Sequence, residues 1–197
     1  MRKFKLAEKI IELEAQAIKE QVRHLDSNFN NVIYMIKKCT GHVVIMGIGK
    51  SGLVGKKISA TMSSVGIPSI FLHPTECLHG DLGTFMKNDI VIILSYSGET
   101  EEIKNILPIL RKMKMKIIAI TGHPNASIWH NSDYIINCYV TKEACPHNFT
   151  PTSSTIAMLA MGDALAITVS NLKKIKVEYL SLLHPSGAVG KKLIQKK

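Results

Sequence analysis

VVIMGIGKSG (residues 43–52) and IVIILSYSGET (residues 90–100) each run from four or five apolar residues into a loop of small ones. Such apolar runs are typical of strands covered on both faces, as in a parallel sheet with helices on each side. Ligands of these sheets bind at the carboxyl ends of the strands, where each loop leads into a helix. The free backbone amides at the N-terminus of that helix favour an anion. The second loop adds the hydroxyls of Ser95, Ser97 and Thr100, which can donate to phosphate oxygens, so the pair of loops indicates a phosphorylated ligand.

Strand-like and helical segments alternate along the rest of the chain. The expected strands are residues 43–46, 69–72, 90–94, 116–120 and 134–140, and the expected helices after the first of them are 51–65, 99–114, 125–131 and 153–172. A proline-containing loop, residues 141–152, precedes the last helix. This alternation predicts an α/β fold, a three-layer α/β/α sandwich around a five-stranded parallel sheet.

The first 40 residues are predicted to be helical. Apolar residues recur at helical spacing over residues 6–38, in one long helix or in two helices interrupted near residues 26–28. We expect an N-terminal helical segment, residues 1–40, packed on the domain formed by residues 41–197. The longest apolar stretch, residues 155–172, is interrupted by Asp163 and by small and polar residues. The sequence therefore predicts no membrane span.

The formal net charge of +10 raises the question of a nucleic-acid partner. Residues 171–197 hold seven lysines against one acidic residue, so +6 of that excess lies in this segment. Aromatic residues make up only 6% of the chain and no base-reading motif is present, which favours a basic surface that steers a small anionic substrate. Four scattered cysteines without paired spacing, and the lack of an apolar signal-peptide core, predict a reduced cytoplasmic protein.

The first loop also matches the GxGxxG fingerprint of dinucleotide-binding folds. That fingerprint requires an acid at the end of the second strand, whereas this strand ends in His73 and Pro74 with no acid before Glu76. A nucleotide P-loop does not fit either, since the glycine it requires five residues before Gly49 falls at Val44. For this loop alone, the alternative is a glycine turn that only lets helix and strand pack closely.

The two loops and six further segments together resemble the sugar isomerase (SIS) domain family, and within it the D-arabinose 5-phosphate isomerases. The further segments are HPTE at 73–76, HGDLG at 79–83, KEACP at 142–146, PTSST at 151–155, MGDAL at 161–165 and HPSGA at 184–188. Tyr96 stands where many relatives have Asn, and Ser186 where many have Gly. Many relatives continue into a pair of CBS domains, so the resemblance is to a SIS-only form that lacks them.

This resemblance implies a flavodoxin-like SIS domain that interconverts D-ribulose 5-phosphate and D-arabinose 5-phosphate, supplying Kdo for lipopolysaccharide or capsule. Such an isomerase moves a proton between C1 and C2 through an enediol(ate), so it needs an acid/base group and polar groups near the reacting oxygens. By resemblance, the catalytic residues are Lys50, Glu102, Glu143 and His184, and the substrate-binding residues are Gly49, Ser51, His79, Ser95, Ser97, Gly98 and Thr100. Glu99 and Glu101 compete with Glu102 for the place in the first helical turn.

This reaction requires no cofactor or metal. His73, Glu76 and His79 lie three residues apart, but Pro74 argues against a helix that presents them together, so we expect no metal site. Two alternatives remain: an isomerase of another phosphosugar, such as a hexulose 6-phosphate or sedoheptulose 7-phosphate, or a non-catalytic sugar-phosphate-binding regulator. Regulators of this kind carry an N-terminal helix-turn-helix domain, for which 40 residues are too few.

The N-terminal helix has apolar residues on more than one stripe, with Ile11 and Ile18 offset from Leu6, Ile10 and Leu13. Surplus apolar surface on a helix usually marks an interface, so we expect a homo-oligomer. The resemblance further implies a dimer or tetramer with active sites shared between subunits. His184, in the irregular segment after the last long helix, is then expected to reach a neighbour's pocket at Lys50 and Ser51.

Overall fold

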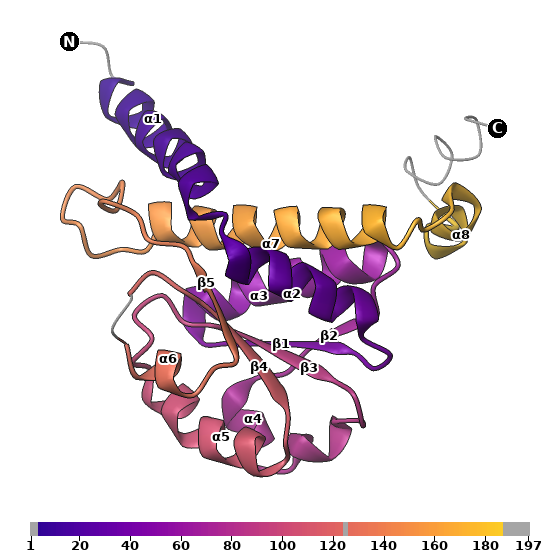
Figure 1. Cartoon of the computed structure of the whole chain (residues 1–197). Helices are drawn as coiled ribbons and strands as arrows, with labels where there is room; N and C mark the ends of the chain where they lie inside the picture. The colour runs from indigo at the N-terminus through magenta and orange to yellow at the C-terminus, as the bar shows by residue number, and fades with distance from the viewer. Residues whose placement is uncertain (1–3, 124–125, 187–197) are drawn as a thin grey trace.

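The computed structural model describes residues 4–123 and 126–186. Among these residues, five parallel strands form one sheet in the order β2-β1-β3-β4-β5 (Figure 1). The strands are β1 (Val43–Gly47), β2 (Ser69–Phe71), β3 (Ile90–Leu94), β4 (Lys116–Thr121) and β5 (Tyr134–Asn137). The expected five-stranded parallel sheet is confirmed.

The apolar runs form strands because successive side chains are buried on opposite faces of the sheet. Along β3, Ile92 packs into the core on one face, whereas Val91 and Ile93 pack into the core on the other, and all three are fully buried. The neighbouring strand β1 places Ile45 beside Ile92 on the first face. Burial of each such side chain contributes about 1.5–3 kcal/mol. Because both faces of the strand are buried, every position along it is apolar, as in a sheet that is covered on both sides.

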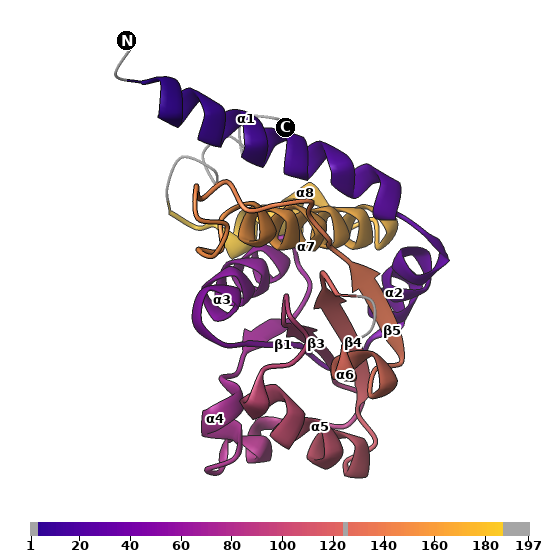
Figure 2. The same cartoon turned by 90° about the vertical axis from the view of Figure 1, so that its left-hand side faces the viewer.

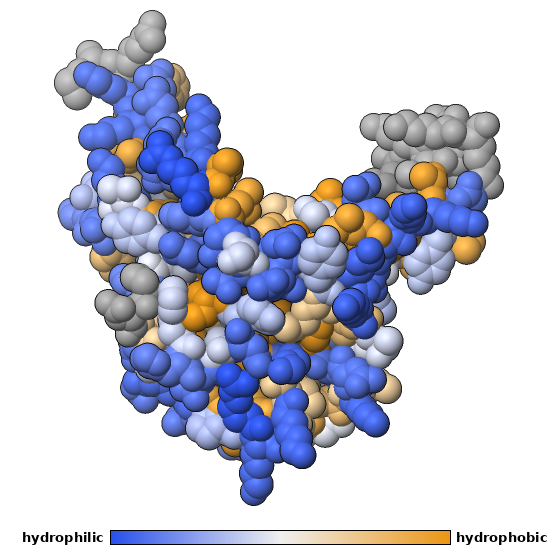
Figure 3. All heavy atoms as spheres, in the orientation of Figure 1, coloured by the Kyte–Doolittle hydropathy of each residue, from blue (hydrophilic) through white to orange (hydrophobic). Residues whose placement is uncertain are grey.

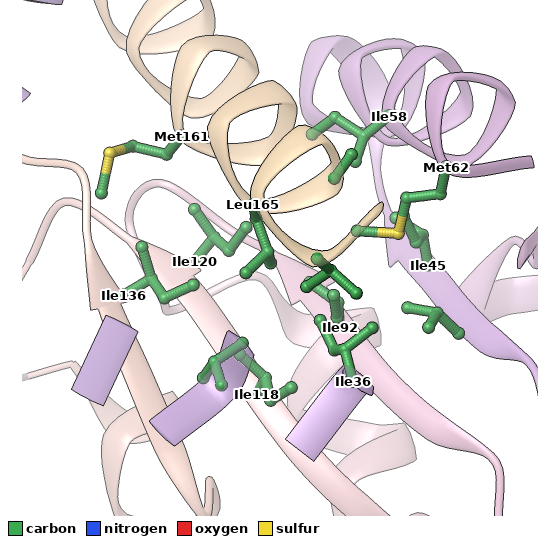
Figure 4. Close-up of a cluster of buried hydrophobic side chains, with 14 of the residues drawn as sticks. Ile36, Ile45, Ile58, Met62, Ile92, Ile118, Ile120, Ile136, Met161 and Leu165 are labelled. Carbon is green, nitrogen blue, oxygen red and sulfur yellow. The ribbon is translucent and has the colours of Figure 1, made fainter. Parts of the chain in front are cut away.

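Helices cover both faces (Figures 1 and 2). The first face carries α2 (Ser27–Lys38), α3 (Gly49–Ser64) and α7 (Ser153–Leu172), and the second carries α4 (Pro74–Cys77), α5 (Glu101–Lys112) and α6 (Ser127–His130). Figure 4 shows Ile36 of α2, Ile58 of α3 and Leu165 of α7 converging above the strands. The three-layer sandwich is therefore confirmed.

The N-terminal region forms two helices that are separated by a short 3₁₀ turn. The elements are α1 (Lys5–Glu20), η1 (Gln21–His24) and α2. The break falls at Asp26, whose Oδ1 accepts a hydrogen bond from the Phe29 amide at 3.0 Å and so caps the N-terminus of α2. Helix α2 contributes Phe29, Val32 and Ile36 to the core, whereas only Ala17 of α1 is buried. Helix α1 instead packs on the outer side of α7 (Figure 2).

Helix α7 is the central helix of the first face. Among the described residues it alone is long and apolar enough to cross a membrane by length and composition. Its apolar side chains are used inside the domain, because Ala157, Leu165 and Val169 are fully buried. Gly162 lets α7 approach α3 closely, since a Cβ there would collide with the Ile58 side chain.

The expected boundary that differs most from the structure is the end of β5. Strand β5 ends at Asn137 instead of residue 140, because the Asn137 side chain accepts a hydrogen bond from the Tyr139 amide at 2.9 Å and turns the chain. A short helix, α4, begins at Pro74 and ends at Cys77, so of His73, Glu76 and His79 it contains only Glu76. Proline is tolerated there because the first helical residue needs no amide donor.

The segment after α7 also differs from expectation. Instead of being irregular, it contains α8 (Val177–Leu183), and His184 is the residue that ends this helix. None of the seven residues of α8 is buried. Seven residues span only two helical turns, which is too short a stretch for apolar spacing to reveal a helix. A further 3₁₀ turn, η2 (Asp81–Thr84), follows α4.

Candidate active site

The first small-residue loop lies at the carboxyl edge of the sheet and joins β1 to α3. Gly49 begins α3 with a φ of +56°, a conformation that glycine adopts without strain. A side chain at Gly52 would meet the Gly47 carbonyl oxygen at 2.7 Å, so glycine allows the helix to start directly beside the strand. Lys50 is exposed and Ser51 is half-buried in the first turn. Free amides and the helix dipole make this turn favourable for an anion.

The second loop joins β3 to α5 and is held in shape by its own hydroxyls. Ser95 is buried, and its Oγ accepts a hydrogen bond from the Gly98 amide at 3.1 Å and lies 3.1 Å from Thr100 Oγ1. Ser97 Oγ accepts from the Glu99 amide at 3.3 Å, and Gly98 has a φ of +68°. The loop therefore wraps around its hydroxyls directly before a helix N-terminus, an arrangement that suits a phosphate group.

The three glutamates that follow this loop have different surroundings. Glu99 accepts hydrogen bonds from the Ser127 amide and hydroxyl, which lower the pKa of its carboxyl group and tie the loop to α6. Glu101 forms an ion pair with Lys104 at 2.5 Å. Glu102 is half-buried and has no side-chain partner in the part of the chain that the structure describes. Of the three, Glu102 is the carboxylate available to a ligand.

A pocket of about 440 Å³ lies beside the two loops. Its walls come from the loops after β1, β3, β4 and β5 and from the first turns of α7. Side chains from each of these segments line it, namely Ser51, Tyr96, His123, Glu143 and Ser154. Of the residues expected from the sequence, Ser51 and Glu143 line this pocket. Lys50, Ser95 and Ser97 are immediate chain neighbours of Ser51 and Tyr96, whereas Gly98, Thr100 and Glu102 lie two, four and six residues beyond Tyr96.

Glu143 is fixed by the N-terminus of α7. Its Oε2 accepts hydrogen bonds from the Thr152 amide at 2.8 Å, the Thr152 hydroxyl at 3.1 Å and the Ser154 amide at 3.1 Å. The Glu143 amide in turn donates to Asn148 Oδ1 at 2.8 Å. The Thr152 side chain does not cap α7 in the usual way, so Glu143 takes over that role. The carboxylate is thereby held in one orientation at the pocket wall.

Tyr96 forms a wall of this pocket. Its hydroxyl accepts a hydrogen bond from the Val140 amide at 3.2 Å and donates to the Val140 carbonyl at 3.4 Å. Its ring meets the His123 ring edge-on, with centroids 5.3 Å apart. Burial raises the pKa of the Tyr96 hydroxyl to about 12, so it stays protonated. The side chain of Tyr96 therefore connects the segments that follow β3 and β5.

The remaining expected residues lie elsewhere in the chain. His184 ends α8, whereas Glu143 is bonded to the N-terminus of α7. Helix α8 lies at the opposite end of α7 from that terminus (Figure 1). The 20 residues of α7 separate these ends by about 30 Å, at about 1.5 Å per helical residue. His184 Nδ1 contacts the Leu180 carbonyl at 2.9 Å, and His79 is exposed after α4. Across residues 4–123 and 126–186, no three His, Cys, Asp or Glu side chains are grouped to hold a metal ion.

The sandwich, the hydroxyl-rich loop at its carboxyl edge and the adjoining pocket define a class of α/β domains that bind phosphorylated small molecules. The sequence model of the SIS domain matches residues 35–168, and the chain belongs to the SIS domain family.

Two relatives from Escherichia coli are similar over almost the whole chain. Arabinose 5-phosphate isomerase KdsD of strain K12 is 42% identical over 185 residues, which is 94% of this chain. Arabinose 5-phosphate isomerase KpsF of E. coli O6:H1, strain CFT073, is 41% identical over 182 residues, which is 92% of this chain. This chain spans 56% of the length of each.

A solved structure of an E. coli CFT073 protein in complex with arabinose 5-phosphate has the same fold. It superposes with a TM-score of 0.88 at 39% identity, covering 91% of this chain and 96% of that one.

Proposed function

We propose that this protein is an aldose–ketose isomerase that interconverts D-ribulose 5-phosphate and D-arabinose 5-phosphate. The observation that carries the proposal is the 39% identity to the structure in complex with arabinose 5-phosphate, which extends over nearly all of both chains. The relatives named as arabinose 5-phosphate isomerases, at 41–42% identity, support the same activity. The product is a precursor of Kdo, used in lipopolysaccharide or capsule, and is made in the bacterial cytoplasm.

The phosphate group binds at the second loop in this proposal. Ser95, Ser97, Thr100 and the amide of Gly98 surround it, and Gly49 and Ser51 in the first turn of α3 complete the anion site. The hydroxyl-lined loop at a helix N-terminus supports this assignment. Anchoring the phosphate leaves the carbon chain of the sugar free to extend into the 440 Å³ pocket toward Glu143.

Glu143 is the base of the proposed reaction. It removes the proton from C2 of the open-chain aldose, and the C1 carbonyl oxygen takes up the electron pair to give an enediolate. A proton then passes from the C2 oxygen to the C1 oxygen and Glu143 returns its proton to C1, which gives the ketose with no net oxidation and no cofactor. Lys50 and Glu102 bind the sugar oxygens, and His79 orders the sugar hydroxyls. His184 opens the sugar ring and exchanges protons with its oxygens.

The site is completed by a second copy of the chain. Within one chain the length of α7 separates His184 from Glu143 (Figure 1), so His184 serves a neighbour's pocket. Exposed apolar side chains for an interface occur on α1, α7 and α8, including Ile11 at 67%, Ile167 at 54% and Leu182 at 74% exposure. Figure 3 shows apolar surface in the hollow between α1 and α8. A homo-oligomer, a dimer or tetramer, buries this surface.

The proposal is tested by turnover of the purified protein on ribulose 5-phosphate, followed by proton NMR in D₂O. We expect arabinose 5-phosphate to form, with solvent deuterium entering at C2. Parallel assays contain a hexulose 6-phosphate and sedoheptulose 7-phosphate. Faster turnover of either compound would show that it is the substrate in place of ribulose 5-phosphate, and the protein would still be an isomerase. Binding of the ketose phosphates without any turnover would reject catalysis and favour a sugar-phosphate-binding regulator.

A further inference from the structure

Two adjacent serines begin α7, and both have a buried hydroxyl. Ser153 and Ser154 are 0% exposed. Neither Oγ has a hydrogen-bond partner among the residues that the structure describes. Leaving a buried polar atom without a partner is unfavourable, and most buried polar atoms in folded proteins are paired. The two hydroxyls therefore need an explanation beyond the fold.

The surroundings of the two serines differ. Ser154 lines the 440 Å³ pocket together with Ser51, Tyr96 and Glu143, whereas Ser153 does not. The Ser154 hydroxyl thus belongs to a residue that borders the space proposed to receive the sugar. Its desolvation has already occurred in the free protein, so a hydrogen bond to a ligand oxygen adds binding energy without a further desolvation cost on the protein side.

The position of Ser154 beside Glu143 indicates which ligand oxygen it meets. The Ser154 amide donates to Glu143 Oε2 at 3.1 Å, so the hydroxyl of the same residue lies near that carboxylate. A sugar oxygen that contacts Ser154 Oγ is then attached to a carbon within reach of Glu143. In the proposed reaction, that oxygen is one of the pair on C1 and C2.

We propose that Ser154 Oγ donates a hydrogen bond to the oxygen on which negative charge develops in the enediolate, an inference that rests on the proposed isomerase function. The N-terminus of α7 adds its dipole to this stabilisation. The hydroxyl is available for this bond because no described protein group uses it, unlike Thr152 Oγ1, which donates to Glu143. Ser154 is thus a catalytic residue that stabilises the transition state more than the bound substrate.

The test compares Ser154→Ala with Ser153→Ala. Both variants remove a buried hydroxyl without a partner from the same helix turn, so neither should lower the urea midpoint of unfolding. Loss of one oxyanion donor typically costs about 10²–10³-fold in kcat. We expect Ser154→Ala to lose roughly 10²-fold in kcat with little change in KM, and Ser153→Ala to stay within about threefold of the wild type. Equal losses in both variants, or a higher KM at unchanged kcat in Ser154→Ala, would overturn the inference.

A binding measurement separates this inference from the isomerase proposal itself. If the wild type does not turn over ribulose 5-phosphate, the proposed function fails. Calorimetric titration with arabinose 5-phosphate and with inorganic phosphate then tests the hydroxyl alone. The wild type, Ser153→Ala and Ser154→Ala are compared. If only Ser154→Ala binds the sugar phosphate more weakly and all three bind inorganic phosphate equally, Ser154 is a sugar-binding residue and has no role in turnover. For a wild type without turnover, unchanged sugar-phosphate binding by Ser154→Ala would reject the sugar-binding role as well.

Discussion

Glu143 both lines the pocket and closes the N-terminus of α7, because its Oε2 accepts from Thr152 and Ser154. Two substitutions of Glu143 distinguish its proposed role as a base from its role in capping α7. Glu143→Gln keeps a side-chain oxygen that can accept the same hydrogen bonds, but it cannot take a proton as a base. Glu143→Ala also leaves the two amides without their partner.

We expect both Glu143 variants to lose about 10²–10⁴-fold in turnover, the range typical of a general base. Glu143→Ala alone should lose about 1–2 kcal/mol of unfolding free energy, as for loss of a helix cap. The NMR assay and urea denaturation measure the two effects. More than a tenth of wild-type turnover in Glu143→Gln would exclude Glu143 as the base.

At the scale of elements, Asp133 connects α5, β4 and the start of β5. Its carboxylate pairs with Arg111 at 2.9 Å and with Lys116 at 3.1 Å, and it accepts from the Ile117 amide at 2.9 Å. Burial of Asp133 opposes ionisation, but the Ile117 amide and the two cations outweigh it and lower the pKa of the carboxyl group. The charged form is therefore the one that stabilises the folded protein.

Asp133→Asn should lower the unfolding free energy at pH 7 by roughly 1–2 kcal/mol, since it weakens hydrogen bonds to charged groups at a partly exposed site. The folded pKa lies below the unfolded value, so this contribution is fully present above the unfolded pKa of about 3.9 and is lost as pH falls through the folded pKa. Urea denaturation from pH 7 to pH 3 should show the wild-type advantage shrinking at the acidic end. The matched variant Asp81→Asn, at an exposed position, should change stability by less than about 0.5 kcal/mol. A wild-type advantage that stays constant down to pH 3 would contradict this assignment.

At the scale of the whole molecule, we propose a homo-oligomer with shared active sites because His184, at the end of α8, lies far from the pocket of its own chain. Lys50→Ala and His184→Ala should each be inactive alone. If the site takes Lys50 from one chain and His184 from another, a mixed dimer contains one site in which both groups are intact. Random 1:1 mixing should then restore about a quarter of wild-type activity after co-refolding.

The control for this experiment is the same pair of variants mixed without unfolding, which should regain activity only as fast as subunits exchange. Light scattering should report a dimer or tetramer at micromolar concentration. A fully active monomer, or a co-refolded mixture with no activity, would reject the shared site.

Much of this molecule follows from local sequence. The strands β1 and β3 are predictable because four or five consecutive apolar residues suit a strand buried on both faces, and α7 is predicted at its observed bounds. Helix α8 escapes prediction, because seven residues, none of them buried, are too few to define a helical period. The early end of β5 also escapes prediction, because it depends on a single side-chain hydrogen bond of Asn137.

The sequence by itself determined the number and order of the strands, the two small-residue loops that follow β1 and β3 and, through its motifs, the SIS family. Only the tertiary structure decided which residues share the pocket. Ser51, Tyr96, Glu143 and Ser154 come from four separate segments, and packing of α7 across the sheet brings them together. Local patterns report which residues are buried, because burial depends on the period of a strand or helix. They do not report which distant segments meet, and so the anchoring of Glu143 by α7 and the free hydroxyl of Ser154 became visible only in the folded part of the chain that the structure describes.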